Sequence, residues 1–300
     1  LQAKVFLGID KKQSTLELGA ICNSLEDYGC ASRYFYRVVK EDPNHRQALA
    51  NLAMSYARRG LWRVARPNFE AYFSLGGNAY DVAFWYGKTL YQLEGRDRGI
   101  EWYYYSLRMN ARFDEAAEEL VEDLMAAGEV DEALGLIGAI TRGRPDKFPY
   151  WKKRLDSAPF LKRDLVREKD VVWRLPSLDG VYYYLPVILK KNGRLQFFRV
   201  DEKHKQNFVS VEVLDEHLVE LPDNARKERA TINNEEFEVE KFKLKDVIIG
   251  AWKKPELHLY ACRGCPVSLG KDFLKSFLIE KWSTSKINYM TLRSNSNSMK

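Results

Sequence analysis

One aspartate follows an apolar run in the stretch FRVDEKHKQNFVS, which covers residues 198 to 210. A carboxylate at the end of a hydrophobic strand can act in hydrolysis when a second carboxylate faces it and the two share one proton. Here Asp201 is followed by Glu202 and Lys203, and a nearby ammonium group favours the ionised form of an acid. The stretch therefore has two interpretations, a catalytic acid and the charged, solvated end of a hairpin.

Two cysteines, Cys262 and Cys265, form the other arrangement that could carry chemistry. A disulfide or two packed thiols is the favoured interpretation, since a two-residue spacer after a strand makes a loop that a bond could close. A redox pair is a second interpretation, although such thiols are normally activated at a helix N-terminus. Zinc is a third, with His258 as a ligand and His204 or His217 needed to complete four.

The composition of the 300-residue chain, with 45% hydrophobic residues, fits one large or two ordinary globular domains. No apolar run approaches the length of a membrane span. Residues 1 to 147 carry 19 Lys and Arg against 21 Asp and Glu, a net charge of −2, and residues 148 to 300 carry 29 against 21, a net charge of +8. Because no basic helix or stripe accompanies this charge, we expect no nucleic-acid partner.

A period of thirty-four residues organises the first half of the chain. It generates a column of turn positions, two columns of mostly small residues and one of bulky apolar residues: Pro43, Gly77, Ala111, Pro145; Ala31, Ala65, Gly99, Ala133; Gly19, Ala53, Gly87, Val121; and Phe35, Phe69, Tyr103, Ile137. A small residue lets two helices approach, and a bulky one fills the adjacent hole. The columns predict helix pairs at 12–45, 46–79, 80–113 and 114–147.

These columns resemble those of the tetratricopeptide repeat (TPR) family. The resemblance implies a solenoid over residues 1–147 whose first helices line a concave groove for a peptide or helix of a partner protein. Residues 148–170 are expected to form a capping helix, within 149–165, and a linker. Cys22 and Cys30 fall on the first helix pair, where buried thiols are expected. Carrying the family's groove positions across places eight residues there: Arg58, Phe84, Lys88, Tyr91, Glu115, Glu118, Glu119 and Glu122.

The fourth helix pair is acidic, with nine acids and no Lys or Arg from Asp114 to Glu132. Acids near a helix N-terminus interact favourably with the helix dipole and solubilise an exposed face. The alternative is an acidic clamp for a basic partner segment. Binding to such a clamp would weaken with salt and with the substitutions Glu118→Lys and Glu122→Lys.

Short strands replace the helical period after about residue 170. The stretch VYYYLPVILKKNGRLQFFRVD predicts two strands joined at Asn192-Gly193, a dipeptide suited to a type I′ turn. QNFVSVEVL, a hairpin around Asn233-Asn234, VIIGAW and PELHLYAC predict further strands. A single helix is predicted for GKDFLKSFLIEKW, residues 270–282, and a flexible tail for 283–300.

The order of these pieces resembles the retropepsin-like aspartic protease domain over roughly residues 180 to 282. The resemblance lies in a hairpin ending in Asp201, a second hairpin, and the segment Leu269-Gly270-Lys271-Asp272-Phe273-Leu274. It implies a small all-β barrel with one helix over 171–282. Asp201 then occupies the place of the family's catalytic aspartate, which is usually supplied once by each subunit of a dimer.

Glu202 and Lys203 depart from the family's Asp-Thr-Gly motif. In the family the Thr hydroxyls lock the two turns together, and the Gly permits a tight backbone approach that a residue with a Cβ cannot readily copy. The departure predicts that Asp201 is a relic and that the β domain is a degenerate one, able to hold a peptide by β-augmentation. The alternative is an aspartic endopeptidase active as a homodimer through Asp201.

Together these patterns predict a multidomain α + β protein, an all-α TPR solenoid followed by the retropepsin-like barrel. The predicted function is a non-catalytic scaffold that binds a protein or peptide partner in its groove, with the pseudo-protease domain as a second interaction module. No Ser-His-Asp order, phosphate-cradling loop or dinucleotide fingerprint is present, so no cofactor or metal is predicted. The domain combination resembles bacterial envelope proteins, which suggests the periplasm or cell envelope, with the cytoplasm as the alternative.

Overall fold

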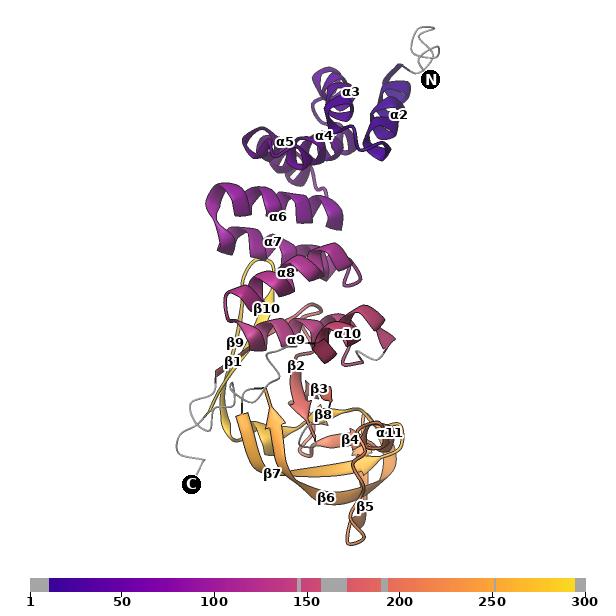
Figure 1. The fold of residues 1–300 in the computed structure, drawn as a ribbon, viewed down its shortest axis with the longest axis vertical. Helices are drawn as coiled ribbons and strands as arrows, with labels where there is room; N and C mark the ends of the chain where they lie inside the picture. The colour runs from indigo at the N-terminus through magenta and orange to yellow at the C-terminus, as the bar shows by residue number, and fades with distance from the viewer. Residues whose placement is uncertain (1–10, 145–146, 158–171, 190–193, 251, 295–300) are drawn as a thin grey trace. The chain divides into compact units, whose positions relative to one another are not determined.

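The structure is a computed structural model in which two compact units, Leu1–Ala117 and Glu118–Lys300, can be distinguished (Figure 1). It describes residues 11–144, 147–157, 172–189, 194–250 and 252–294. Of the sequence-based expectations, the Asn192-Gly193 turn, Pro145 and the second half of the capping segment lie outside the described residues. Within the described part of the chain, no helix is long and apolar enough to cross a membrane.

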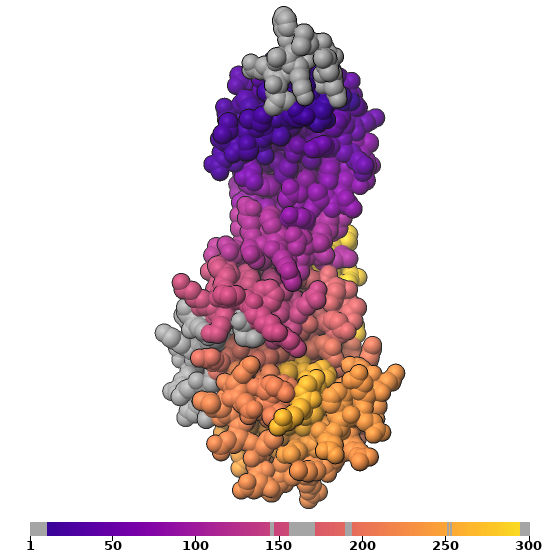
Figure 2. Space-filling view, turned by 90° about the vertical axis from the view of Figure 1, so that its right-hand side faces the viewer, coloured from indigo at the N-terminus to yellow at the C-terminus, as the bar shows by residue number. Residues whose placement is uncertain are grey.

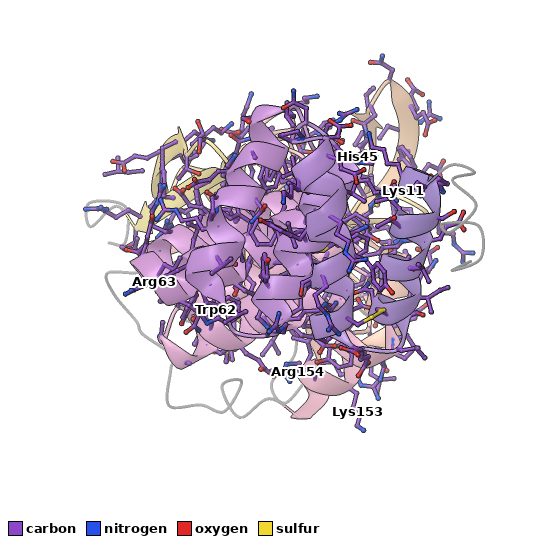
Figure 3. The ribbon with its side chains drawn as sticks, turned by 90° about the horizontal axis from the view of Figure 1, so that it is seen from above. Lys11, His45, Trp62, Arg63, Lys153 and Arg154 are labelled. Atoms are coloured by element: carbon purple, nitrogen blue, oxygen red, sulfur yellow. A yellow bond between two sulfur atoms is a disulfide. The ribbon has the colours of Figure 1, made fainter. Side chains whose placement is uncertain are left out.

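Helix pairs build the first unit, as the thirty-four-residue period predicts. They are α2 (Lys11–Ser24) with α3 (Tyr28–Glu41), α4 (Arg46–Arg58) with α5 (Trp62–Ser74), and α6 (Tyr80–Glu94) with α7 (Arg96–Met109), followed by the start of α8 (Asp114–Ala126). Where the first pair meets α4, Lys12 forms an ion pair with Asp42, and His45 accepts a hydrogen bond from the backbone N–H of Ala48. Figure 3 shows Lys11 and His45 on the same side of these helices.

The small and bulky columns of the repeat meet inside each pair. A methyl group placed on Gly19 would lie 2.6 Å from a ring carbon of Phe35, and one on Gly87 would lie 2.8 Å from the ring of Tyr103 and 3.0 Å from the carbonyl oxygen of Gly99. Phe35 and Tyr103 are almost fully buried. A ring from the partner helix thus fills the space that a side chain on the glycine would occupy.

Cys22 and Cys30 are bonded to each other, which corrects the expectation of two buried thiols. The bond joins the end of α2 to the first turn of α3 across a turn of exposed residues, and both cysteines are partly exposed. The expectation failed because the helical pattern places both residues on a helix, but the chain reversal between them brings their Cα atoms to 5.7 Å.

The second unit joins helices to a strand-rich domain. Its helices after α8 are α9 (Val130–Thr141) and α10 (Pro149–Ser157). The later elements are β1 (Val172–Ser177), β2 (Tyr184–Ile188), β3 (Leu195–Val200), β4 (Phe208–Ser210), α11 (Val211–Glu216), β5 (Arg226–Ile232), β6 (Glu235–Ile249), β7 (Trp252–Cys262), β8 (Ser268–Leu269), α12 (Lys271–Leu274), β9 (Phe277–Ser283) and β10 (Asn288–Ser294).

A barrel of six strands encloses the main core of this unit. The strands follow the order β2-β3-β8-β4-β7-β6, and pairing of β2 with β6 closes the ring. Strand β5 extends it as a hairpin with β6, whose two-residue turn at Asn233 and Asn234 has φ values of 52° and 69°, the left-handed angles that Asn tolerates. Phe198, Leu259 and Phe273 are among the buried residues of the core.

Helix α9 packs directly on β1 and β2, and all of it lies in the same compact unit as the barrel. Glycines on α9 make the contact close: a methyl group on Gly138 would lie 2.6 Å from Cβ of Tyr184, and one on Gly135 would lie 3.2 Å from Pro176. In Figure 2 the pink residues of this helical part adjoin the orange residues of the strands.

The C-terminal elements correct two predictions. The helix predicted over 270–282 is only α12, and β9 follows it; the tail predicted as flexible contains β10, which pairs with both β1 and β9. The apolar residues of FLKSFL have helical spacing, but backbone pairing with β10 overrides that local preference. Trp282 of β9 stacks on Tyr289 of β10 with ring centroids 4.4 Å apart.

Replacing Gly87 by Ala should destabilise the first unit, even though Ala is the better helix former. The added methyl group has to displace the Tyr103 ring and the Gly99 backbone. We expect a loss of about 2 kcal/mol in the free energy of unfolding, measured by urea denaturation. Gly29→Ala is the matched control, because its methyl group would meet only a side-chain oxygen at 3.4 Å; equal effects of the two changes would contradict the packing described here.

Candidate functional site

Asp201 lies directly after β3 and is held in place by the segment Leu269-Gly270. Its backbone N–H donates to the carbonyl oxygen of Leu269 at 2.9 Å. Gly270 passes so close to the following turn that a methyl group on it would lie 2.1 Å from the carbonyl oxygen of Gln206. Its N–H donates to Oδ1 of Asn207 at 2.8 Å. The shape of this corner therefore depends on a residue without a side chain.

The Asp201 carboxylate is 5% exposed and fully engaged. Oδ2 accepts from Nη2 of Arg199 at 3.1 Å and lies 2.8 Å from Nδ1 of His204. Oδ1 accepts from the backbone N–H groups of Lys203, at 2.9 Å, and His204, at 3.3 Å. The carboxylate therefore has cationic or N–H donors on both oxygens.

Burial raises the pKa of Asp201, but the hydrogen bonds from the His204 ring and from the backbone N–H groups of Lys203 and His204 outweigh it, so that the pKa lies below its usual value. The sequence-based argument assigned this effect to the Lys203 ammonium. In the structure Lys203 contacts Asp201 through its backbone, and the basic side chains on the carboxylate are those of Arg199 and His204. Arg199 and His204 were missed because Arg199 comes from β3 and His204 from the turn after it, and only the folded turn brings both side chains to Asp201.

His204 connects this corner to the tip of the β5–β6 hairpin. The backbone N–H of Asn233 points to its Nε2 at 3.4 Å, so Nδ1 carries the hydrogen that faces Asp201. The neighbouring Glu202 forms an ion pair with Lys281 of β9. Chemically, the corner holds an ionised aspartate with its donors in place and a second carboxylate that is paired elsewhere.

Cys262 and Cys265 form a disulfide bond, the favoured sequence-based interpretation. They are 2% and 5% exposed and lie in a small apolar cluster with Phe208, Ile232 and Val239. Burial and bonding leave neither thiol to a metal. Across the described ranges no three His, Cys, Asp or Glu residues are grouped as a metal site would need, and the side chain of His258 lies beside Glu256.

Two of the predicted groove residues, Arg58 of α4 and Lys88 of α6, meet over one aromatic ring. The Arg58 guanidinium lies 4.5 Å from the ring centroid of Trp85, and the Lys88 ammonium lies 5.1 Å from it. Arg58 also donates to the Tyr28 hydroxyl at 3.1 Å. We call Tyr28, Arg58, Trp85 and Lys88 the cation cluster. Trp85 was missed, although it occupies the same repeat position as the predicted Glu119, thirty-four residues earlier.

A cavity of about 640 Å³ lies along the same two helices, one turn from the cation cluster. Met54, one turn before Arg58, and Asp81, one turn before Trp85, both line it. Its other lining residues come from α4, from the end of α5 with the loop after it, and from the start of α6: His45, Arg46, Gln47, Ala50, Asn51, Tyr72, Gly77, Asn78, Ala79 and Val82. The cavity and the cluster together form a continuous polar and apolar surface, here called the α4–α6 surface.

Two further predicted groove residues, Phe84 and Tyr91, have rings that pack against neighbouring helices. Phe84 is 0% exposed and packs its ring against Tyr103 and Phe113. Tyr91 is half-buried between α6 and α7, where its Cβ fills the space above Gly99 and its ring stacks on Tyr103. Both were assigned by repeat position alone, and large aromatic residues at those positions turn toward the neighbouring helix to bury their rings.

The acidic positions of α8 have mixed surroundings. Glu122 pairs with Arg154 of α10 at 2.9 Å, and Glu118 hydrogen-bonds to Tyr150 of the same helix; Arg154 is labelled in Figure 3. Glu115 is exposed and Glu119 half-buried. α10 thus already supplies one cation to the acidic stripe, which reduces the charge available to a basic partner.

Comparison with known proteins gives coarse likenesses only. No family model matches the chain, and no curated protein matches it. Among solved structures, MamA from Desulfovibrio magneticus RS-1 is 17% identical over 46% of this chain and 77% of its own, with a TM-score of 0.41. YrrB, described as a TPR protein with an unusual peptide-binding site, is 20% identical over 44% and 68%, with a TM-score of 0.38.

A retropepsin-like aspartic protease from Rickettsia conorii is 16% identical over 43% of this chain and 98% of its own, with a TM-score of 0.31. The chain thus resembles TPR proteins and a retropepsin-like protease, as the sequence predicted. Each likeness covers less than half of this chain at a TM-score below 0.5, so none of them indicates a function.

Replacing Asp201 by Asn should lower the free energy of unfolding by about 2 kcal/mol at neutral pH, because the buried Arg199 and His204 contacts lose their anion. Since the folded-state pKa is lowered, this contribution is present above the unfolded value, about 3.9, and is lost as the pH falls through the folded value. The difference between wild type and variant in urea denaturation should therefore shrink below about pH 4. Asp215→Asn, at an exposed position of α11, is the control and should show no such difference.

Proposed function

We propose that this chain is a non-catalytic interaction scaffold whose α4–α6 surface binds a segment of a partner protein. The observation that carries the proposal is the cation cluster beside a cavity of about 640 Å³, because it combines charge, aromatic surface and space on the first helices of two successive pairs. Solenoid proteins use such surfaces, formed by successive repeats, for extended partners.

The chemistry of the surface defines the kind of segment that it suits. The Arg58 guanidinium has more N–H donors than its hydrogen bond to Tyr28 uses, Lys88 adds a second positive charge over the same ring, and Arg46 adds a further cation at the cavity. Asp81 is the acidic residue among the cavity-lining residues. An extended segment with acidic side chains beside an apolar one would place the acids at the cation cluster and the apolar group against Met54.

The barrel is proposed as a second interaction module without peptidase activity. Supporting this, both oxygens of Asp201 are engaged, whereas hydrolysis requires a half-protonated pair of carboxylates around a water. Strand β9 is an edge strand of its three-stranded sheet and exposes Leu278 and Ile279, which is a suitable edge for strand addition. Charged residues of β5, such as Lys227 and Arg229, protect the other sheet's edge from pairing.

We also propose an oxidising compartment such as the bacterial cell envelope. The support is the two disulfide bonds, since such bonds persist outside the cytoplasm.

Reversing the charge of the cation cluster should weaken partner binding. Peptides selected from a displayed library with the full-length chain should be rich in acids, and the double variant Arg58→Glu, Lys88→Glu should bind them at least about tenfold more weakly in fluorescence anisotropy. The matched control is Arg63→Glu, Arg112→Glu, which makes the same change in net charge at exposed positions outside the α4–α6 surface. Equal weakening by both double variants, or no peptide sensitive to the first, would contradict the proposed surface.

The full-length chain should show no peptide hydrolysis between about pH 4 and pH 7. The reason is that the engaged Asp201 cannot share a proton with a second carboxylate. A fluorogenic peptide mixture, followed together with the molecular mass in solution, tests this. Cleavage that disappears in Asp201→Asn would instead establish the homodimeric endopeptidase.

A further inference from the structure

A second cavity, separate from the α4–α6 surface, lies between α3 and the end of α4. It has a volume of about 410 Å³ and is lined by Gly29, Ser32, Arg33, Tyr36, Tyr56 and Arg59. The four residues from α3 are spaced three and four apart, so they lie on one face of that helix. Arg58 is the last residue of α4 and Arg59 is its C-cap; Arg58 lies over Trp85 in the cation cluster, whereas Arg59 lines this cavity.

The lining of this cavity carries two guanidinium groups and no acid. Neither Arg33 nor Arg59 forms an ion pair with any residue that the structure describes. Elsewhere in the same unit arginines are matched, as Arg66 is with Glu70 and Glu94. Two cations that line one cavity without an acid repel each other, so an anion bound in the cavity would stabilise both.

The remaining polar groups of the cavity are hydroxyls. Nη1 of Arg59 donates to Oγ of Ser32 at 3.1 Å, which orients the guanidinium along the cavity. Tyr36 is 53% exposed and Tyr56 is half-buried. Burial, and then the neighbouring Tyr36, raise the pKa of Tyr56 against the opposing effect of Arg59, so its phenol stays protonated and can donate. The cavity is thus lined by donors on several sides.

We propose that this cavity, the α3–α4 site, binds a tetrahedral dianion of the phosphate type, either free or attached to a phosphorylated residue. Two planar guanidinium forks match the oxygens of a phosphate group, and the hydroxyls of Tyr36 and Tyr56 can donate to the remaining ones, whereas the Ser32 hydroxyl already donates to the carbonyl oxygen of Gly29. A carboxylate has only two oxygens in one plane and could engage only part of this donor set. The disulfide at Cys30 fixes the first turn of α3, which carries Gly29.

Titration of the full-length chain with four probes tests the site: inorganic phosphate, sulfate, N-acetyl-phosphoserine amide and acetate, followed through the arginine side-chain NMR signals at low salt. We expect the dianions to bind and acetate to bind at least about tenfold more weakly. Arg33→Gln and Arg59→Gln should each weaken phosphate binding about tenfold, the loss expected for a hydrogen-bonded charge. The control Arg63→Gln, at the exposed position labelled in Figure 3, should change it less than twofold.

Further measurements identify the source of the anion and provide additional checks of the site. Tighter binding of the phosphoserine derivative than of phosphate indicates a phosphorylated residue, and the reverse indicates the free anion; both support the site. Tyr36→Phe removes one exposed hydroxyl and should weaken binding modestly without unfolding the chain. Binding of the phosphoserine derivative should also weaken below about pH 6, where its second proton returns.

Acetate binding as tightly as phosphate would overturn the proposal, as would binding unaffected by Arg33→Gln and Arg59→Gln. The site is independent of the α4–α6 surface, so the variant Arg58→Glu, Lys88→Glu should keep its phosphate binding. Failure of the partner-binding proposal and failure of this one are therefore distinguishable.

Discussion

The barrel depends on one close backbone approach, that of Gly270 to the turn after Asp201. Because Gly270 has no side chain, β8 can pair with β3 on one side and with β4 on the other. The N–H groups of Lys271 and Asp272 then donate to the carbonyls of His204 and Lys205, both at 2.9 Å. These hydrogen bonds fix the turn. The turn then directs the backbone N–H groups of Lys203 and His204 to the Asp201 carboxylate. The ionised state of Asp201 thus depends on the backbone path that brings these N–H groups to its carboxylate.

The helix pairs also depend on close approach at small residues, and this packing creates two different kinds of surface. Inside each pair an aromatic ring fills the space beside a small residue. Aromatic residues such as Phe84 are therefore buried there. Between successive pairs the rings carry cations over their faces, as at Trp85. Aromatic residues are therefore used twice, once as packing and once as a platform for charge. The repeat position alone does not determine which use applies.

Much of this fold follows from the sequence because its signals are periodic or local. The columns through Gly87 and Tyr103 predict the helix pairs, and Asn233-Asn234 predicts the hairpin turn. The partial failures concern long-range contacts. The segment after Phe273 has helical spacing but pairs with β10, and Cys22 meets Cys30 only after the chain reverses. At the site, the position of Asp201 was readable, but the approach of Arg199 and of His204 depended on the fold of the turn.

Helix α9 belongs to the repeat pattern of the sequence, and it also packs against β1 and β2. In solenoids the last repeat would otherwise expose an apolar face to water, and proteins normally cover it with a dedicated polar helix. Here Gly135 and Gly138 let strands pack closely against that face instead, and Glu132 forms an ion pair with Arg174 of β1. The barrel therefore covers the face of α9 that a dedicated capping helix would otherwise cover.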